Sequence, residues 1–181
     1  MTNYPTTQGR TAQEAPVRVS RPGTVLAAGL TAMAVGLAAL LNGLVVMLDK
    51  VGVLTEALVK EGGVDTALAE SVAKQMVQES EGELGAAFEI LQNRSYVLIA
   101  SGALLLLFGF FLLLKAAVWS RVLVTLTAIA AAGFSLIVVT DVATSLMGAM
   151  CWIALIGAPV AIVMAWLPAN SRYAKALKQR A

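Results

Sequence analysis

Residues 97–114 read VLIASGALLLLFGFFLLL, a run of 18 residues without a charged side chain. As an α-helix this run is about 27 Å long, close to the ~30 Å thickness of a bilayer's hydrocarbon core. Arg94 precedes it, and Lys115 and Trp119 follow it, as is typical of residues at membrane interfaces. The run therefore predicts a membrane-spanning helix, which we expect over residues 95–115.

Three further apolar blocks, at residues 23–48, 121–140 and 142–167, predict three more spans. The last two are separate, because residues 122–167 as one helix would be ~69 Å long, about twice what a bilayer needs. Hydrophobic residues make up 59% and charged residues 13% of the chain, against roughly 45–50% and about 25% in a soluble domain. The sequence predicts an all-α membrane protein, a bundle of four transmembrane helices.

The chain before the first block is polar. Residues 1–22 contain Pro5, Pro16 and Pro22 and no apolar period, which predicts a disordered tail. A cleavable signal peptide has an apolar core of about 7–15 residues near the N-terminus. Because the block at 23–48 is longer and begins later, we expect a retained helix rather than a signal peptide.

Basic residues mark one side of the membrane. Nine of the 13 lie before the first span, around the link between the second and third, or after the fourth. Residues 49–94, between the first two spans, contain nine acidic and four basic residues, a net charge of −5. Because basic residues accumulate on the cytoplasmic side of a membrane protein, we expect both termini in the cytoplasm. The membrane is expected to be the plasma membrane. The basic tail at 168–181 is then expected to lie along the anionic cytoplasmic leaflet.

The outer segment 49–94 is expected to be helical. Leu68, Val72 and Met76 recur at helical spacing, and the glycines at 62–63 form a helix stop. A cap of 46 residues is too small to bury a good core by itself. Its apolar stripe must therefore pack on the segment itself, on the outer ends of the spans, on another copy or on a different protein. These three apolar residues are the candidate partner surface.

Small residues form stripes in the first and last spans. Gly29, Gly36 and Gly43 recur at seven-residue spacing, nearly two helical turns, and Gly157 and Ala161 are four residues apart. Such stripes let two helices approach closely. We expect these residues to form helix–helix contacts, either within one chain or between copies.

The interiors of the expected spans contain no charged side chain, which counts against a proton-coupled transporter or an ion pump. Their polar groups are mild, and Asn42 in the first span is the most notable of them. A buried amide either hydrogen-bonds across a helix interface or lines a wet cavity. Both interpretations of Asn42 remain open, and it joins the candidate packing residues.

Few residues of this chain are suited to catalysis. It contains no histidine, the usual general base and metal ligand, and its one cysteine, Cys151, is expected to be a buried structural thiol. Glu79, Glu81 and Glu83 form a carboxylate cluster, but without the spaced pattern of a calcium loop. We therefore expect no catalytic residues, no cofactor and no metal. The net charge of +2 is too small to indicate nucleic acid as a partner.

Residues 166–173, directly after the last span, read WLPANSRY. This ending resembles those of small uncharacterised actinobacterial four-span membrane proteins. The resemblance covers little more than these residues, implies a bacterial plasma membrane and carries no activity with it. The layout of four spans with a larger first outer segment is also similar to that of tetraspanins and claudins, but their outer cysteines are absent from this chain.

These features favour a non-catalytic accessory or scaffold protein. It would assemble with itself or with another membrane complex through the small-residue stripes and the outer cap. The alternative is a small channel formed by several copies, in which the acidic outer segment attracts cations. In that channel Asn42, Thr125 and Ser135 would face water. An enzyme is the third possibility.

Overall fold

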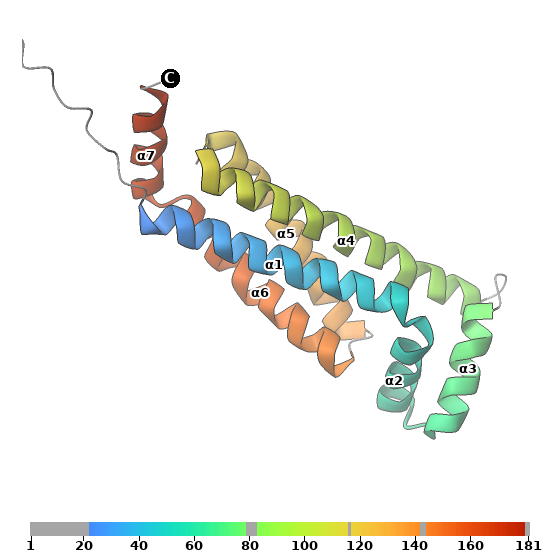
Figure 1. Cartoon of the computed structure of the whole chain (residues 1–181). Coiled ribbons are helices and arrows are strands. Elements are labelled where there is room, and N and C mark those ends of the chain that lie inside the picture. Colours follow the sequence, from blue (N-terminus) through green and yellow to red (C-terminus); the bar gives the residue numbers. More distant parts are fainter. Residues whose placement is uncertain (1–21, 79–82, 116, 142–143, 180–181) are drawn as a thin grey trace, which may run out of the picture.

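The computed structural model describes residues 22–78, 83–115, 117–141 and 144–179, and all the secondary structure in these ranges is α-helical (Figure 1). In chain order the helices are α1 (Gly23–Leu48), α2 (Lys50–Gly62), α3 (Thr66–Gln78), α4 (Glu83–Lys115), α5 (Val118–Asp141), α6 (Ser145–Ala165) and α7 (Pro168–Lys178). Four helices are long and apolar enough to cross a membrane: α1, α4 from Glu89 onward, α5 and α6. The predicted all-α bundle of four spans is confirmed, and the chain is an integral membrane protein.

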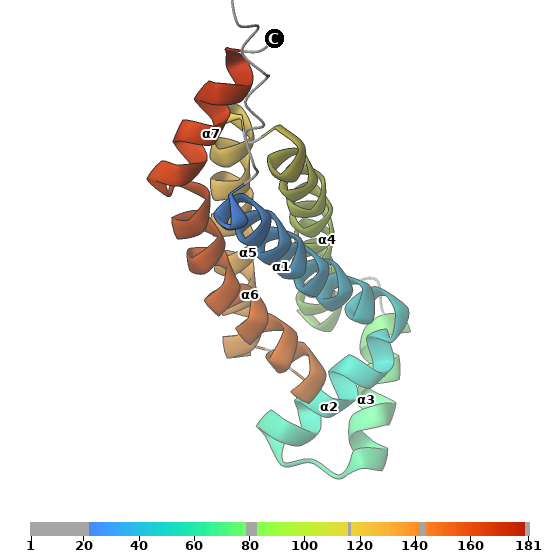
Figure 2. The same ribbon diagram turned by 60° about the vertical axis from the view of Figure 1, so that its left-hand side comes forward.

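Helix α1 lies at the centre of the bundle. It packs along α4 on one side and α6 on another, and α5 closes the bundle between those two helices (Figures 1 and 2). Its inward face consists mainly of small residues, among them the fully buried Ala28, Ala32 and Ala39. Because alanine adds little bulk, α1 can contact several neighbours closely at once.

Helix α4 begins at Glu83, whereas the expected span began at residue 95. Residues 83–94 contain no proline and are mostly good helix formers, so they continue into the span as one helix. The last span differs at its other end. Helix α6 ends at Ala165 because Pro168 takes the first position of a new helix, α7, where its missing N–H costs nothing.

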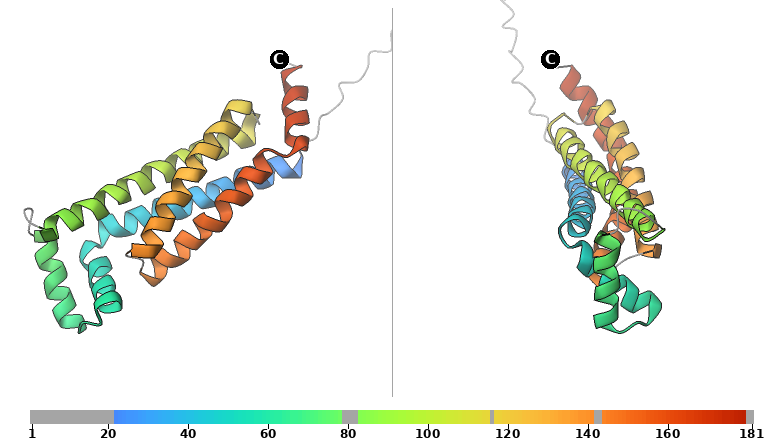
Figure 3. Two further views of the ribbon diagram at one scale, coloured as in Figure 1. Left: turned by 180° about the vertical axis from the view of Figure 1, so that it is seen from behind. Right: turned by 90° about the vertical axis from the view of Figure 1, so that its right-hand side faces the viewer.

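The outer segment contains a helical hairpin, α2 and α3, which projects beyond one end of the bundle (Figures 1 and 3). Asp49 accepts a hydrogen bond from the Gly52 N–H at 2.9 Å and begins α2. Gly63 ends α2 with φ of 60°, a left-handed conformation that glycine adopts without strain. Asp65 begins α3 by accepting from the Ala67 N–H at 3.2 Å. We call this end, which carries the hairpin, the acidic end.

The opposite end carries α7 and the start of α1, so the described chain begins and finishes on the same side of the bundle (Figure 1). We call it the basic end. The Thr24 hydroxyl of α1 donates to the Asn170 Oδ1 of α7 at 2.5 Å, and the Asn170 Nδ2 donates to the Met164 carbonyl at 2.7 Å. Of the predicted disordered tail, 1–22, residues 1–21 lie outside the described residues. The carboxylates of Glu79, Glu81 and Glu83 lie outside the described residues and side chains.

Candidate functional site

Gly29, Gly36 and Gly43 of α1 all face α4. A Cβ atom added at Gly36 would lie 2.8 Å from the Gly102 carbonyl oxygen, and one added at Gly102 would lie 2.6 Å from the Gly36 carbonyl oxygen. Gly43 approaches the Ser95 carbonyl in the same way, and Gly29 faces Leu113. At this crossing backbone meets backbone, so any side chain at Gly36 or Gly102 would push the two helices apart.

The small residues of α6 face α1 from the other side. A Cβ atom at Gly157 would meet the Val35 side chain at 2.5 Å, and Ala161 is fully buried. The structure therefore brings all five predicted small residues into contacts within one chain. These stripes are covered by the chain's own helices, and the faces that remain exposed on the spans consist largely of leucine, isoleucine and valine.

Asn42 joins α1 to α6. Its amide Nδ2 donates a hydrogen bond to the Cys151 Sγ at 2.9 Å, and both residues are completely buried. Ser135 on α5 is also completely buried. Among the described residues the Asn42 Oδ1 and the Ser135 Oγ have no hydrogen-bond partner. Asn42 thus makes a hydrogen bond across a helix interface in the interior of a single chain.

Cys151 provides a reporter of folding, because it is the only thiol and is completely buried. We expect a maleimide to leave Cys151 unmodified in mild detergent or nanodiscs and to modify it after denaturation in SDS. Mass spectrometry of the intact chain measures the modified fraction. Rapid modification of the native protein would show that the centre of the bundle opens to solvent.

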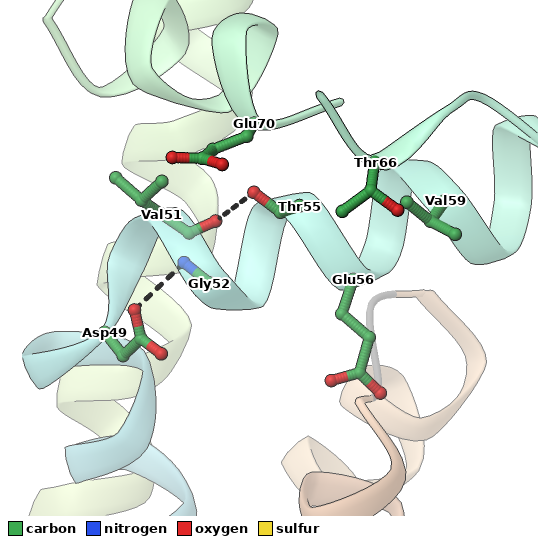
Figure 4. Close-up of a pocket in the computed structure, with 8 residues that line it drawn as sticks. All are labelled: Asp49, Val51, Gly52, Thr55, Glu56, Val59, Thr66 and Glu70. Carbon is green, nitrogen blue, oxygen red and sulfur yellow. Dashed lines mark hydrogen bonds between the residues drawn. The ribbon is translucent and has the colours of Figure 1, made fainter. Parts of the chain in front are cut away.

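At the acidic end, a cavity of about 530 Å³ lies between α2 and α3 (Figure 4). Three carboxylates from different elements line it: Asp49, Glu56 and Glu70. In Figure 4 the Asp49 side chain is directed at Gly52, and Glu56 points away from α2 toward the start of α6. The carboxylates surround the cavity without converging on one point.

Each of these carboxylates already has a partner. Glu56 accepts from the Ser145 N–H at 2.8 Å and from its hydroxyl at 3.3 Å, and so caps α6. Glu70 pairs with Lys74 at 2.6 Å, and this hydrogen bond and positive charge lower the pKa of Glu70. In the part of the chain that the structure describes, no three side chains are placed to hold a metal ion. The cavity attracts cations through its charge, but its carboxylates are committed to structural contacts.

Removing the carboxylate of Glu56 should loosen the hairpin from the bundle. In Glu56→Ala, Ser145 loses a capping partner that lies 89 residues away in the chain. We expect a cost of about 0.5–2 kcal/mol, the usual range for a helix cap. Hydrogen exchange of the amides at the start of α6 should become faster. Glu61→Ala, an exposed glutamate at the end of α2, is the matched control and should leave those amides unchanged.

The residues of the candidate partner surface are partly buried and partly exposed. Met76 is buried and Val72 is half-buried against the chain's own core, whereas the side chain of Leu68 is 57% exposed. The reason is a shift of the buried face, since Ala69, Ala73 and Met76 are the residues that α3 buries. Only Leu68 of the predicted three is available to a partner.

Sequence reasoning assigned Arg121 to the interface and missed its role in packing. The Arg121 guanidinium donates to the Asn170 carbonyl at 2.6 Å and to the Ser171 hydroxyl at 2.9 Å, and only 1% of the residue is exposed. Trp166 adds a bond from its indole N–H to the Thr125 hydroxyl at 3.0 Å. The available signal was the polar sequence 170–172 directly after the last apolar span, together with an arginine in the first turn of α5.

The chain was also compared with known proteins. No family model matches it, and neither the curated proteins nor the solved structures gave a match.

Proposed function

We propose that this integral membrane protein is a non-catalytic accessory subunit, a scaffold that presents the α2–α3 hairpin to another membrane protein. The observation that carries the proposal is the way in which the hairpin is fixed. One residue, Asp49, separates α1 from α2, and its side chain caps α2. From the other side Glu56 bonds to the start of α6. A hairpin fixed to two spans presents its surface in one orientation, as a docking module requires.

The charge of the outer segment indicates the chemistry of the partner. Residues 49–94 have a net charge of −5, and Leu68 and Ser71 are exposed on one face of α3. Because two copies of this segment would repel one another, the charge favours a different protein over a second copy. The proposed partner is a membrane protein with a basic outer surface.

The alternative, a pore formed by several copies, would also benefit from the acidic segment, which would concentrate cations at its mouth. A pore between copies is lined by the outer faces of the spans. Asn42 and Ser135 are completely buried among the helices of one chain, so they are not available to such a lining. This burial supports the scaffold over the pore.

Site-specific photocrosslinking in native membranes tests the proposal. A photoreactive amino acid at position 68 should yield one predominant adduct with a different protein. The same amino acid at Leu136, which is exposed on α5, is the control for contacts between spans. Adducts at Leu136 alone, or adducts at Leu68 only with a second copy of the chain, would contradict docking through the hairpin.

A further inference from the structure

A second and larger cavity lies at the basic end. It is a cleft of about 1040 Å³ between the link from α4 to α5 and the side of α7. Lys115 comes from the end of α4, Arg121 from the first turns of α5, and Lys175 from α7. Three basic side chains from three helices therefore surround one cleft, and none of the described residues that line it is acidic.

Acidic residues are scarce in the part of the sequence that forms this cleft. Between residues 95 and 181 the only acidic residue is Asp141, which lies at the far end of α5. Arg121 is held in position, since its guanidinium donates to the Asn170 carbonyl and the Ser171 hydroxyl. Lys115 and Lys175 are exposed and can turn toward a ligand. The arrangement suits an anion, and phosphate oxygens accept several such charge-assisted bonds.

The remaining walls of the cleft are apolar and exposed. They include Val118 and Trp119 at the start of α5 and Leu114 at the end of α4. These side chains lie at the end of two spans, at the level where a tryptophan ring meets the headgroup region. An inorganic anion would leave these walls uncovered, whereas a ligand with a hydrocarbon chain would cover them.

We propose that this cleft binds an anionic phospholipid. The headgroup phosphate lies between Lys115 and Lys175 above the fixed guanidinium of Arg121, and an acyl chain runs along Leu114 and Val118 into the bilayer. The charge complementarity and the continuity between basic and apolar walls select a lipid. This site is independent of the proposed docking of the hairpin, which lies at the opposite end of the bundle.

Lipid retention by the full chain tests the site. The protein is placed in nanodiscs of phosphatidylcholine and phosphatidylglycerol in equal amounts, released gently, and examined by native mass spectrometry. We expect preferential retention of phosphatidylglycerol. In Lys115→Gln/Lys175→Gln this preference should fall by about five- to twentyfold, since each basic residue near an anionic lipid surface contributes roughly a fivefold change in binding.

Matched variants distinguish lipid binding in the cleft from a general attraction of anionic lipids to basic residues. Arg172→Gln removes an exposed charge from α7 outside the cleft and should change retention less than twofold. Lys115→Arg/Lys175→Arg should retain the wild-type preference, and protection of Cys151 from maleimide shows that each variant is folded. Equal retention of both lipids by the wild type, an equal loss in Arg172→Gln, or displacement of the lipid by millimolar inorganic phosphate would overturn the proposal.

Discussion

Alanine at Gly36 is expected to destabilise the bundle, whereas alanine at Gly133 is not. At Gly36 the added Cβ would lie 2.8 Å from the Gly102 carbonyl oxygen and 2.9 Å from the Leu105 Cβ. Neither of these atoms can move without moving α4. Overpacking of this kind costs about 1–3 kcal/mol. Since α1 packs along both α4 and α6, the whole bundle should respond.

The comparison with Gly133 isolates the close approach. A Cβ atom there has no heavy atom within 4 Å, yet glycine-to-alanine gives both helices the same gain of about 1 kcal/mol in helix propensity. The temperature at which Cys151 becomes accessible to maleimide measures the difference between the two variants. If Gly36→Ala were as stable as Gly133→Ala, α1 and α4 would not be in backbone contact.

Replacing Arg121 by alanine should release α7 from the bundle. The substitution removes two hydrogen bonds from a buried guanidinium, to the Asn170 carbonyl and the Ser171 hydroxyl. Hydrogen bonds to charged groups are each worth about 1.5–3 kcal/mol, so the loss of two should weaken the docking of α7 by about 3–6 kcal/mol. Trypsin should then cleave within α7, at Arg172 and Lys175, at least tenfold faster.

Two variants control for the removal of charge and for the removal of a cleavage site. Arg172→Ala removes an exposed cation from α7 and should leave cleavage at Lys175 unchanged. Arg121→Lys keeps the charge but has a single ammonium in place of the forked guanidinium, so it should show an intermediate rate. Cleavage in Arg121→Ala at the wild-type rate would show that Arg121 does not hold α7.

The spans could be predicted from the sequence because a bilayer imposes a length and a polarity that a chain must match. The close helix–helix approach at Gly36 could also be predicted from the sequence, because glycines at seven-residue spacing in a span typically mark a tight helix contact. What could not be seen was the partner of each polar group. Asn42 bonds to a residue 109 positions away and Glu56 to one 89 positions away, and neither spacing leaves a local pattern.

The candidate site was harder to predict than the fold. The sequence predicted an apolar stripe of Leu68, Val72 and Met76 on α3. In the structure the buried face is shifted, and Ala69 and Ala73 pack inward. Alanine is too weakly hydrophobic to reveal that shift. The basic cleft was hidden for another reason: Lys115, Arg121 and Lys175 were explained by topology, and only the fold brings them to one place.

The two ends of the bundle offer opposite charges to their surroundings. The segment 49–94, which includes the hairpin, has a net charge of −5, and the opposite end presents a basic cleft beside a helix held by Arg121. A subunit bound to a lipid at one end and to a protein at the other would hold its partner in a fixed position in the membrane. We expect the bundle to keep one conformation while it holds the partner.

The most direct test of the scaffold is the mass of the complex that contains this chain. Membranes are extracted into nanodiscs without denaturation, and the complex is examined by native mass spectrometry with its proteins identified. The account predicts one foreign membrane protein in fixed stoichiometry with this chain, and its loss when Leu68 is replaced by glutamate. A homo-oligomer of fixed copy number, or a free monomer with no associated protein, would contradict it.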